Sequence, residues 1–117
     1  MGEKIPKNII DKIEDLSNQV YYSMASLMEM AIKISIKKLD VDINQITNVL
    51  YDNEVTELRL EPKHLIFSTT LPFYAQHKDP FDRLLVSQTI VEKYYFCTCD
   101  SIIKDFYTNP DLLLLAF

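Results

Sequence analysis

Two aspartates, separated by a predicted helix and a predicted strand, are the residues of this sequence best suited to chemistry. Asp82 stands in the run Asp-Pro-Phe-Asp-Arg at 79–83, and Asp100 directly follows a short apolar run. Asp79 suits the N-cap of a helix and Pro80 its first position, so Asp82 falls in the first turn. Acids at a helix start and at the end of the next strand can meet at one edge of a parallel sheet. Carboxylates gathered in this way are typical ligands of a hard divalent cation such as Mg²⁺ or Mn²⁺.

Glu29 is a third acid in a comparable position, because it lies in a helical stretch that follows the strand signal at 20–22. Ligands of parallel sheets bind beyond the carboxyl ends of the strands, and all three acids are expected there. The sequence therefore predicts a metal site formed by Glu29, Asp82 and Asp100. Simpler roles are open as well, since acids at helix starts often serve only as caps and acids within helices are often only solvated.

The elements that must position these acids alternate between helices and short apolar strands. Helices are predicted over 6–16, from the low twenties to about 38, from 42, over 61–67, from 79 and over 100–107, and strands over 20–22, 55–60, 94–99 and 112–117. The second helix has two candidate starts, Ser23 and a capping box of Ser26 with Glu29. This alternation favours an α/β fold in which a short parallel sheet carries helices on both faces.

Length and composition narrow the classes of protein that fit. The chain has 117 residues, of which 48% are hydrophobic, which suits a single domain over 1–117. Its one glycine, Gly2, excludes Gly-rich phosphate-binding loops. The net charge of −5 argues against a broad DNA-binding surface, but a cluster of metal-binding acids would add negative charge of this kind. No apolar run approaches the roughly 20 residues of a membrane span, and we expect no membrane association.

The two cysteines, Cys97 and Cys99, are separated by one residue within a predicted strand. Their side chains should point to the same face, and their spacing disfavours a disulfide between them. We expect thiols that are buried in the strand and a reduced, cytoplasmic compartment. The alternative is a soft-metal site completed by His64 or His77, although zinc sites usually space their cysteines more widely.

Three stretches of the sequence resemble the PIN domain, and within it the VapC-like toxins of bacterial toxin–antitoxin pairs. The first is Val-Tyr-Tyr-Ser-Met-Ala-Ser-Leu-Met-Glu-Met-Ala-Ile-Lys at 20–33. The second comprises Leu-Pro at 71–72 and His-Lys-Asp-Pro-Phe-Asp-Arg-Leu-Leu-Val-Ser-Gln-Thr at 77–89. The third is Phe-Cys-Thr-Cys-Asp at 96–100, which is similar to a strand that ends in Thr-x-Asp. Around these stretches, the resemblance extends over nearly the whole chain.

The resemblance implies a PIN-like three-layer fold and metal-dependent cleavage of RNA. Glu29, Asp82 and Asp100 would then hold Mg²⁺ or Mn²⁺, and Arg83 would contact an RNA phosphate or pair with an acid. The implied partners are the RNA substrate, a cognate antitoxin protein and, as a homodimer, a second copy of the chain.

One departure from the family pattern affects these expectations. The family begins with a central strand that ends in a metal-binding Asp, and residues 1–6 resemble the region just after that strand and its helix. We therefore expect a domain that is N-terminally truncated relative to the family, with the central first strand missing. The gap would be closed by the neighbouring strands, by dimerisation or by segment swapping. Two functions follow: an endoribonuclease impaired by the missing Asp, or a non-catalytic module that binds an antitoxin or itself.

Overall fold

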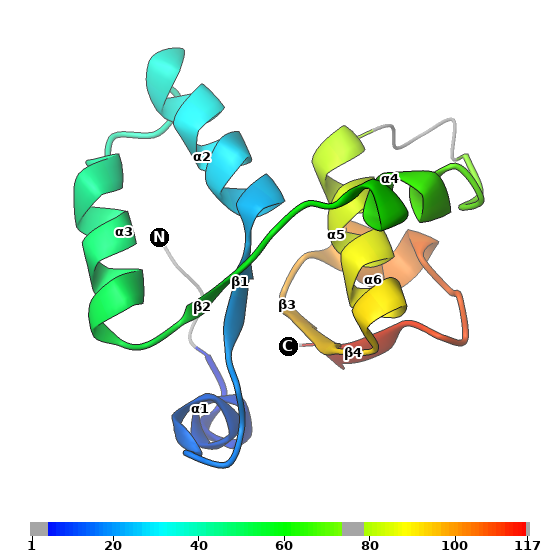
Figure 1. The fold of residues 1–117 in the computed structure, drawn as a ribbon, viewed down its shortest axis with the longest axis horizontal. Coiled ribbons are helices and arrows are strands. Elements are labelled where there is room, and N and C mark those ends of the chain that lie inside the picture. Colours follow the sequence, from blue (N-terminus) through cyan, green and yellow to red (C-terminus); the bar gives the residue numbers. More distant parts are fainter. Residues whose placement is uncertain (1–4, 74–78, 117) are drawn as a thin grey trace. The chain divides into compact units, whose positions relative to one another are not determined.

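The computed structural model describes residues 5–73 and 79–116 of the chain. The elements, in chain order, are α1 (Lys7–Glu14), β1 (Tyr21–Ser23), α2 (Met24–Ser35), α3 (Ile43–Asp52), β2 (Thr56–Leu58), α4 (Pro62–Ser68), α5 (Pro80–Glu92), β3 (Tyr95–Thr98), α6 (Ser101–Phe106) and β4 (Leu113–Ala116) (Figure 1). Their order confirms the predicted alternation of helices and strands. None of the described helices is long and apolar enough to cross a lipid bilayer. The described residues form two compact units: unit 2 is Gln19–Leu60, and unit 1 comprises the residues on either side of it.

Unit 2 consists of two parallel strands joined by two helices. Tyr21 of β1 pairs with Thr56 of β2, and the pairing continues in register to the end of both strands. The hydroxyl oxygen of Ser23 accepts the backbone N–H of Ala25 at 3.0 Å and thereby caps α2 immediately after β1. The alternative start, a capping box at Ser26, is wrong because Ser26 lies inside α2. The earlier cap leaves no loop between β1 and α2.

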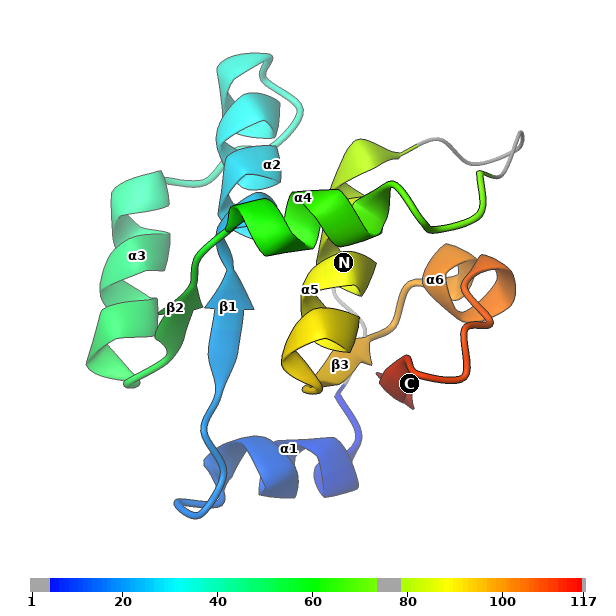
Figure 2. The same cartoon turned by 45° about the vertical axis from the view of Figure 1, so that its right-hand side comes forward.

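Unit 1 holds the main hydrophobic core. The buried core residues are Leu71, Val86, Ile90, Ile103, Tyr107 and Leu112, and Phe67, Phe96, Phe106 and Leu114 pack against them. The core thus joins α5, β3, α6 and β4, and both views show α4 lying across α5 (Figures 1 and 2). Strands β3 and β4 are parallel, with Tyr95 paired to Leu113 and Thr98 to Ala116.

The ends of α5 fix the course of the chain around the predicted acids. Asp79 accepts the backbone N–H of Phe81 at 2.9 Å, so it caps α5 as predicted, with proline at the first helical position. At the other end Lys93 adopts a left-handed conformation with φ of 61°, which ends the helix. A non-glycine residue in this conformation costs about 1–2 kcal/mol. The chain reverses there, and β3 begins two residues later at Tyr95.

The two faces of the β3–β4 sheet differ in their exposure. Phe96 and Leu114 pack toward the core, whereas Tyr95, Cys97 and Cys99 on the opposite face are exposed. The prediction that the cysteines are buried strand thiols is therefore wrong. The physical reason is that the described core packs against the other face, so burial in this strand alternates with residue position.

The four strands form two separate two-stranded sheets, β1–β2 and β3–β4. All pairing among the described strands is parallel, and this confirms the α/β class with short parallel strands. Each sheet contains strands of one unit only, so direct pairing of neighbouring strands across the gap does not occur within the described residues. Dimerisation and segment swapping stay predictions.

Candidate functional site

Asp82 and Asp100 lie toward the same end of one helix–strand hairpin in unit 1. Strand β3 contacts α5 and runs back along it after the turn at Lys93. The helix from Glu92 back to Asp82 rises about 15 Å, at about 1.5 Å for each residue. The extended segment from Tyr95 to Asp100 covers about 17 Å, at about 3.3 Å for each residue. Because the two segments have nearly equal lengths, Asp82 and Asp100 are expected at similar distances from the turn, near the N-terminal end of α5.

Asp82 is buried, with 8% of its surface exposed, in the first turn of α5. A buried carboxylate is costly unless its charge is compensated, and the positive end of the helix dipole supplies part of that compensation. The capping role that could have explained this acid belongs to Asp79 instead. Asp82 is therefore a buried acid of the first helical turn and not the N-cap of α5.

Asp100 is the N-cap of α6, so for this residue the simpler role is realised. Its Oδ1 accepts the backbone N–H of Ile102 at 2.8 Å. Its own backbone N–H donates to the hydroxyl oxygen of Thr98 at 3.0 Å. These two bonds fix the carboxylate at the end of β3, and the cap leaves Oδ2 as the oxygen that can meet a cation.

Glu29 belongs to unit 2, on α2, and so lies in a different unit from the other two acids. Its carboxylate forms an ion pair with Lys33, one helical turn later, at 3.5 Å. The Glu29 side chain is 28% exposed, so it is neither fully solvated nor part of the core. Its convergence with Asp82 and Asp100 stays a prediction.

Arg83, which follows Asp82, binds the segment that connects α4 to α5. Its guanidinium donates to the backbone carbonyl oxygens of Pro72 and Ser68, each at 2.7 Å, and of Leu71 at 3.3 Å. It also lies over the ring of Phe73, 5.5 Å from the ring centre. The geometry gives Arg83 a structural role that the sequence alone did not indicate, since a single arginine reveals nothing of the carbonyls around it.

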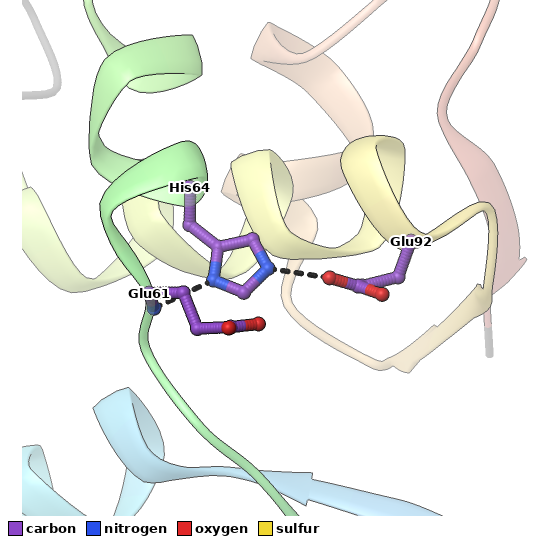
Figure 3. A group of neighbouring side chains, drawn as sticks. All are labelled: Glu61, His64 and Glu92. Carbon is purple, nitrogen blue, oxygen red and sulfur yellow. Dashed lines mark hydrogen bonds and ion pairs between the residues drawn. The ribbon is translucent and has the colours of Figure 1, made fainter.

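A second group of ligand-type side chains lies where α4 contacts α5 (Figure 3). One ligand atom each from Glu61, His64 and Glu92 lies within 4.8 Å of the others. Glu61 and His64 form a capping box at the start of α4, and Glu92 is the last residue of α5. Sequence analysis missed this group because the capping box uses Glu and His in place of the usual Ser or Thr and Glu or Gln.

The hydrogen bonds of His64 determine which of its ring nitrogens carries the proton. Nδ1 accepts the backbone N–H of Glu61 at 2.9 Å, so the proton of the neutral ring lies on Nε2. Nε2–H then donates to Oε2 of Glu92 at 2.7 Å. A cation on Nε2 would move the proton to Nδ1, where it would face the N–H of Glu61. Metal binding at His64 would therefore break the cap of α4, and the group fits a metal poorly.

Lys63 adds one positive charge beside the two carboxylates of this group. Its ammonium nitrogen lies 3.0 Å from Oε2 of Glu92 and 3.7 Å from Oε2 of Glu61. The hydrogen bond from His64, followed by the contact with Lys63, holds the pKa of Glu92 below its ordinary value. The hydrogen bond to Glu92 raises the pKa of Lys63. This positive charge offsets the unfavourable position of a carboxylate at a helix C-terminus. We call Glu61, Lys63, His64 and Glu92 the α4–α5 clasp.

Comparison with known proteins supports the fold through structure and not through sequence. No family model matches the chain, and no curated protein matches it. A similar fold is found in a chain of VapBC2 from Rickettsia felis, with a TM-score of 0.70. The crystal structure of VapBC2 contains a DNA fragment from the promoter of VapBC2. The match covers 96% of this chain and 86% of that chain at 21% identity. This likeness shows that the chain shares the fold of a chain of the VapBC2 complex, in agreement with the fold that the sequence resemblance implies.

Proposed function

We propose that this chain is a VapC-like endoribonuclease that cleaves RNA phosphodiester bonds with a divalent cation, Mg²⁺ or Mn²⁺. The cation would be held by Asp82, Asp100 and Glu29. The observation that carries the proposal is the return of β3 along α5, which directs a buried aspartate and a strand-end aspartate toward one end of the same hairpin. The activity is the one that the sequence resemblance implies, and the similarity of the fold to a chain of the VapBC2 complex agrees with that resemblance.

The donor set fits the proposed ion. All three residues offer carboxylate oxygens, which Mg²⁺ and Mn²⁺ prefer over nitrogen or sulfur. When bound, such an ion offsets the negative charge that develops on a phosphodiester under attack by water. The chain itself contributes fixed positions: Asp82 is held in the first turn of α5, and Asp100 is held by its bonds to Ile102 and Thr98. Fixed carboxylates need less reorganisation when substrate and ion bind.

We also propose an antitoxin protein as the partner of this chain. The similar fold comes from a complex that was crystallised with a fragment of promoter DNA. The net charge of −5 gives this chain little of its own attraction for DNA. In a complex of this chain with an antitoxin, we therefore assign contact with DNA to the antitoxin. The chain is proposed to form a homodimer within that complex, and its location is proposed to be the cytoplasm.

A second candidate function is a non-catalytic module that binds an antitoxin or a second copy of itself. Arg83 favours this candidate, because the guanidinium nearest in sequence to Asp82 is bound to three backbone carbonyls. Three of its five N–H donors are used in this way, which leaves Arg83 less able to bind a phosphate while the α4–α5 connection keeps this structure. Asp100 also supports the non-catalytic candidate, because capping of α6 is sufficient to explain an aspartate at this position.

Cleavage of RNA and binding of Mn²⁺ distinguish the two candidates. Asp100→Asn keeps an oxygen that can cap α6 but removes the charge, and Asp82→Asn is a matched change of equal size. Each variant should lower RNA cleavage at least about a hundredfold, which is the scale of losing one charge-stabilising group at a reacting centre. Asp105→Asn, an exposed aspartate of α6, is the control and should cleave as the wild type does.

Binding of Mn²⁺, followed by electron paramagnetic resonance, is the second measurement. We expect weaker binding in Asp82→Asn and Asp100→Asn and unchanged binding in Glu92→Gln, because the α4–α5 clasp is not assigned to the ion. If the wild type cleaves no RNA and binds no Mn²⁺ at millimolar concentration, the nuclease proposal fails. If it then sediments as a stable dimer, the non-catalytic candidate is the better one.

A further inference from the structure

The exposed face of β3 presents two free thiols in a row. The exposure of side chains alternates along this strand, with Tyr95, Cys97 and Cys99 exposed and Phe96 and Thr98 half-buried. The alternation continues one residue beyond the end of β3, so Cys99 points to the same side as Cys97. Both thiols are free and exposed.

The spacing of the two cysteines along an extended strand allows both sulfur atoms to reach one ligand. Alternate residues of an extended strand have their Cα atoms about 7 Å apart, and rotation of each side chain can bring the sulfurs closer. A cation shared between the two sulfurs would offset the charges of two neighbouring thiolates.

We propose that Cys97 and Cys99 form a two-thiolate site for a soft monovalent cation of the Cu(I) or Ag(I) type. Soft cations select thiolate over oxygen ligands, whereas the carboxylates assigned to Mg²⁺ are hard. On binding, each thiol releases one proton to solvent and its sulfur forms one bond to the cation. Two thiolates and one monovalent cation leave a single negative charge on the site. No electron is transferred, so no oxidant or reductant is needed.

Two thiolates suit a two-coordinate ion better than zinc. A structural zinc site requires four protein ligands, and a third or fourth donor must therefore be found nearby. His64 does not supply it, because it is fully buried and both of its ring nitrogens are occupied in the α4–α5 clasp. His77, the other histidine considered, lies outside the described residues. The preference for a monovalent cation follows from this small donor set.

Native mass spectrometry of the reduced chain with Ag(I) tests the site without any measurement of cleavage. The wild type should bind one Ag(I), and one equivalent should protect both cysteines from alkylation by iodoacetamide. Cys97→Ser and Cys99→Ser should each bind about a hundredfold more weakly, because they lose the second, intramolecular contact. Met28→Leu removes an exposed thioether and is the matched control, with binding expected to equal that of the wild type.

Three outcomes would overturn the proposal. One is binding of two Ag(I) ions to the wild type, which would mean that each thiol acts alone. Another is equal affinity of the wild type and either serine variant. The third is tighter binding of Zn²⁺ than of Ag(I), which would mean that further ligands complete a tetrahedral site. Circular dichroism of both serine variants should match the wild type, because the replaced side chains are exposed. Failure here leaves the proposed nuclease unaffected, since that proposal is tested with Asp82 and Asp100.

Discussion

The Nε2–H of His64 donates a hydrogen bond of 2.7 Å to the carboxylate of Glu92, and this bond joins the start of α4 to the end of α5. The histidine is fully buried, although the glutamate retains some exposure. Because Nδ1 of the same ring caps α4, one side chain serves both the local structure of a helix and its attachment to another helix. The stability of the α4–α5 contact therefore depends on this side chain and on its glutamate partner.

His64→Ala should lower the free energy of unfolding by about 2–4 kcal/mol, since it removes a buried side chain and leaves the carboxylate of Glu92 short of a partner. His64→Asn should lose less, because its amide oxygen can still accept the N–H of Glu61. Urea unfolding followed by circular dichroism measures both. Lys63→Ala, at an exposed residue of the same clasp, serves as the comparison and should have a much smaller effect. A loss for His64→Ala no greater than that for Lys63→Ala would show that the clasp adds little stability.

Stability should fall in acid because of Glu92. The pKa of its carboxyl group is held below 4.5 by the hydrogen bond from His64 and then by Lys63. The unfolded chain therefore binds this proton more readily, and the stabilisation is complete above pH 4.5 and is lost as the pH falls through the lowered pKa. In Glu92→Gln this part of the acid dependence should disappear, as measured by urea midpoints between pH 7 and pH 3. An identical slope in the variant and the wild type would contradict the assignment.

Arg83→Lys should destabilise unit 1 by about 1–3 kcal/mol, because one ammonium group cannot reproduce a planar donor set that reaches three carbonyls. Thermal unfolding gives the size of the effect. RNA binding measured across salt concentrations separates this role from a phosphate contact. If Arg83 is structural, the salt dependence of Arg83→Ala equals that of the wild type, because no phosphate contact is lost. If alanine at this position makes the slope shallower by about one ion without loss of stability, the residue contacts phosphate instead.

Cys97 should react with iodoacetamide more slowly than Cys99 near pH 8. Although Cys97 is an exposed residue, partial desolvation of its sulfur, and then the charge of Cys99, raises the pKa of its thiol, so a smaller fraction of it is thiolate, the reactive form. Cys99→Ser removes the charge and should accelerate the alkylation of Cys97, as followed by peptide mass spectrometry. Equal rates for the two thiols in the wild type, with no change in the variant, would be inconsistent with this coupling.

Local signals predicted the order of elements well. Asp79 with Pro80, and Asp42 before α3, are caps whose hydrogen bonds involve neighbours in the sequence, and the structure has both. Whether Asp82 and Asp100 cap a helix could not be decided from local signals. The answer depends on which backbone N–H groups each carboxylate meets, and a sequence does not contain that information.

Burial was predicted less well than secondary structure, because it depends on what packs against each face. Cys97 and Cys99 were expected inside a sheet covered on both faces, and they are exposed. For His64 the difference is in the opposite direction. The sequence suggested only a role as a soft-metal ligand, and the structure shows a fully buried side chain. In each case the deciding partners come from distant parts of the chain.

The division of the chain into units bears on the order in which the protein folds during synthesis. Gln19–Leu60 is one continuous stretch, so its contacts are all available as soon as β2 has been made. Helix α1 precedes unit 2 in the chain but belongs to unit 1, so the other elements of its unit are made only after unit 2. A nascent chain therefore exposes the apolar side chains of α1 while unit 2 can already fold, and exposed apolar surface is prone to aggregation.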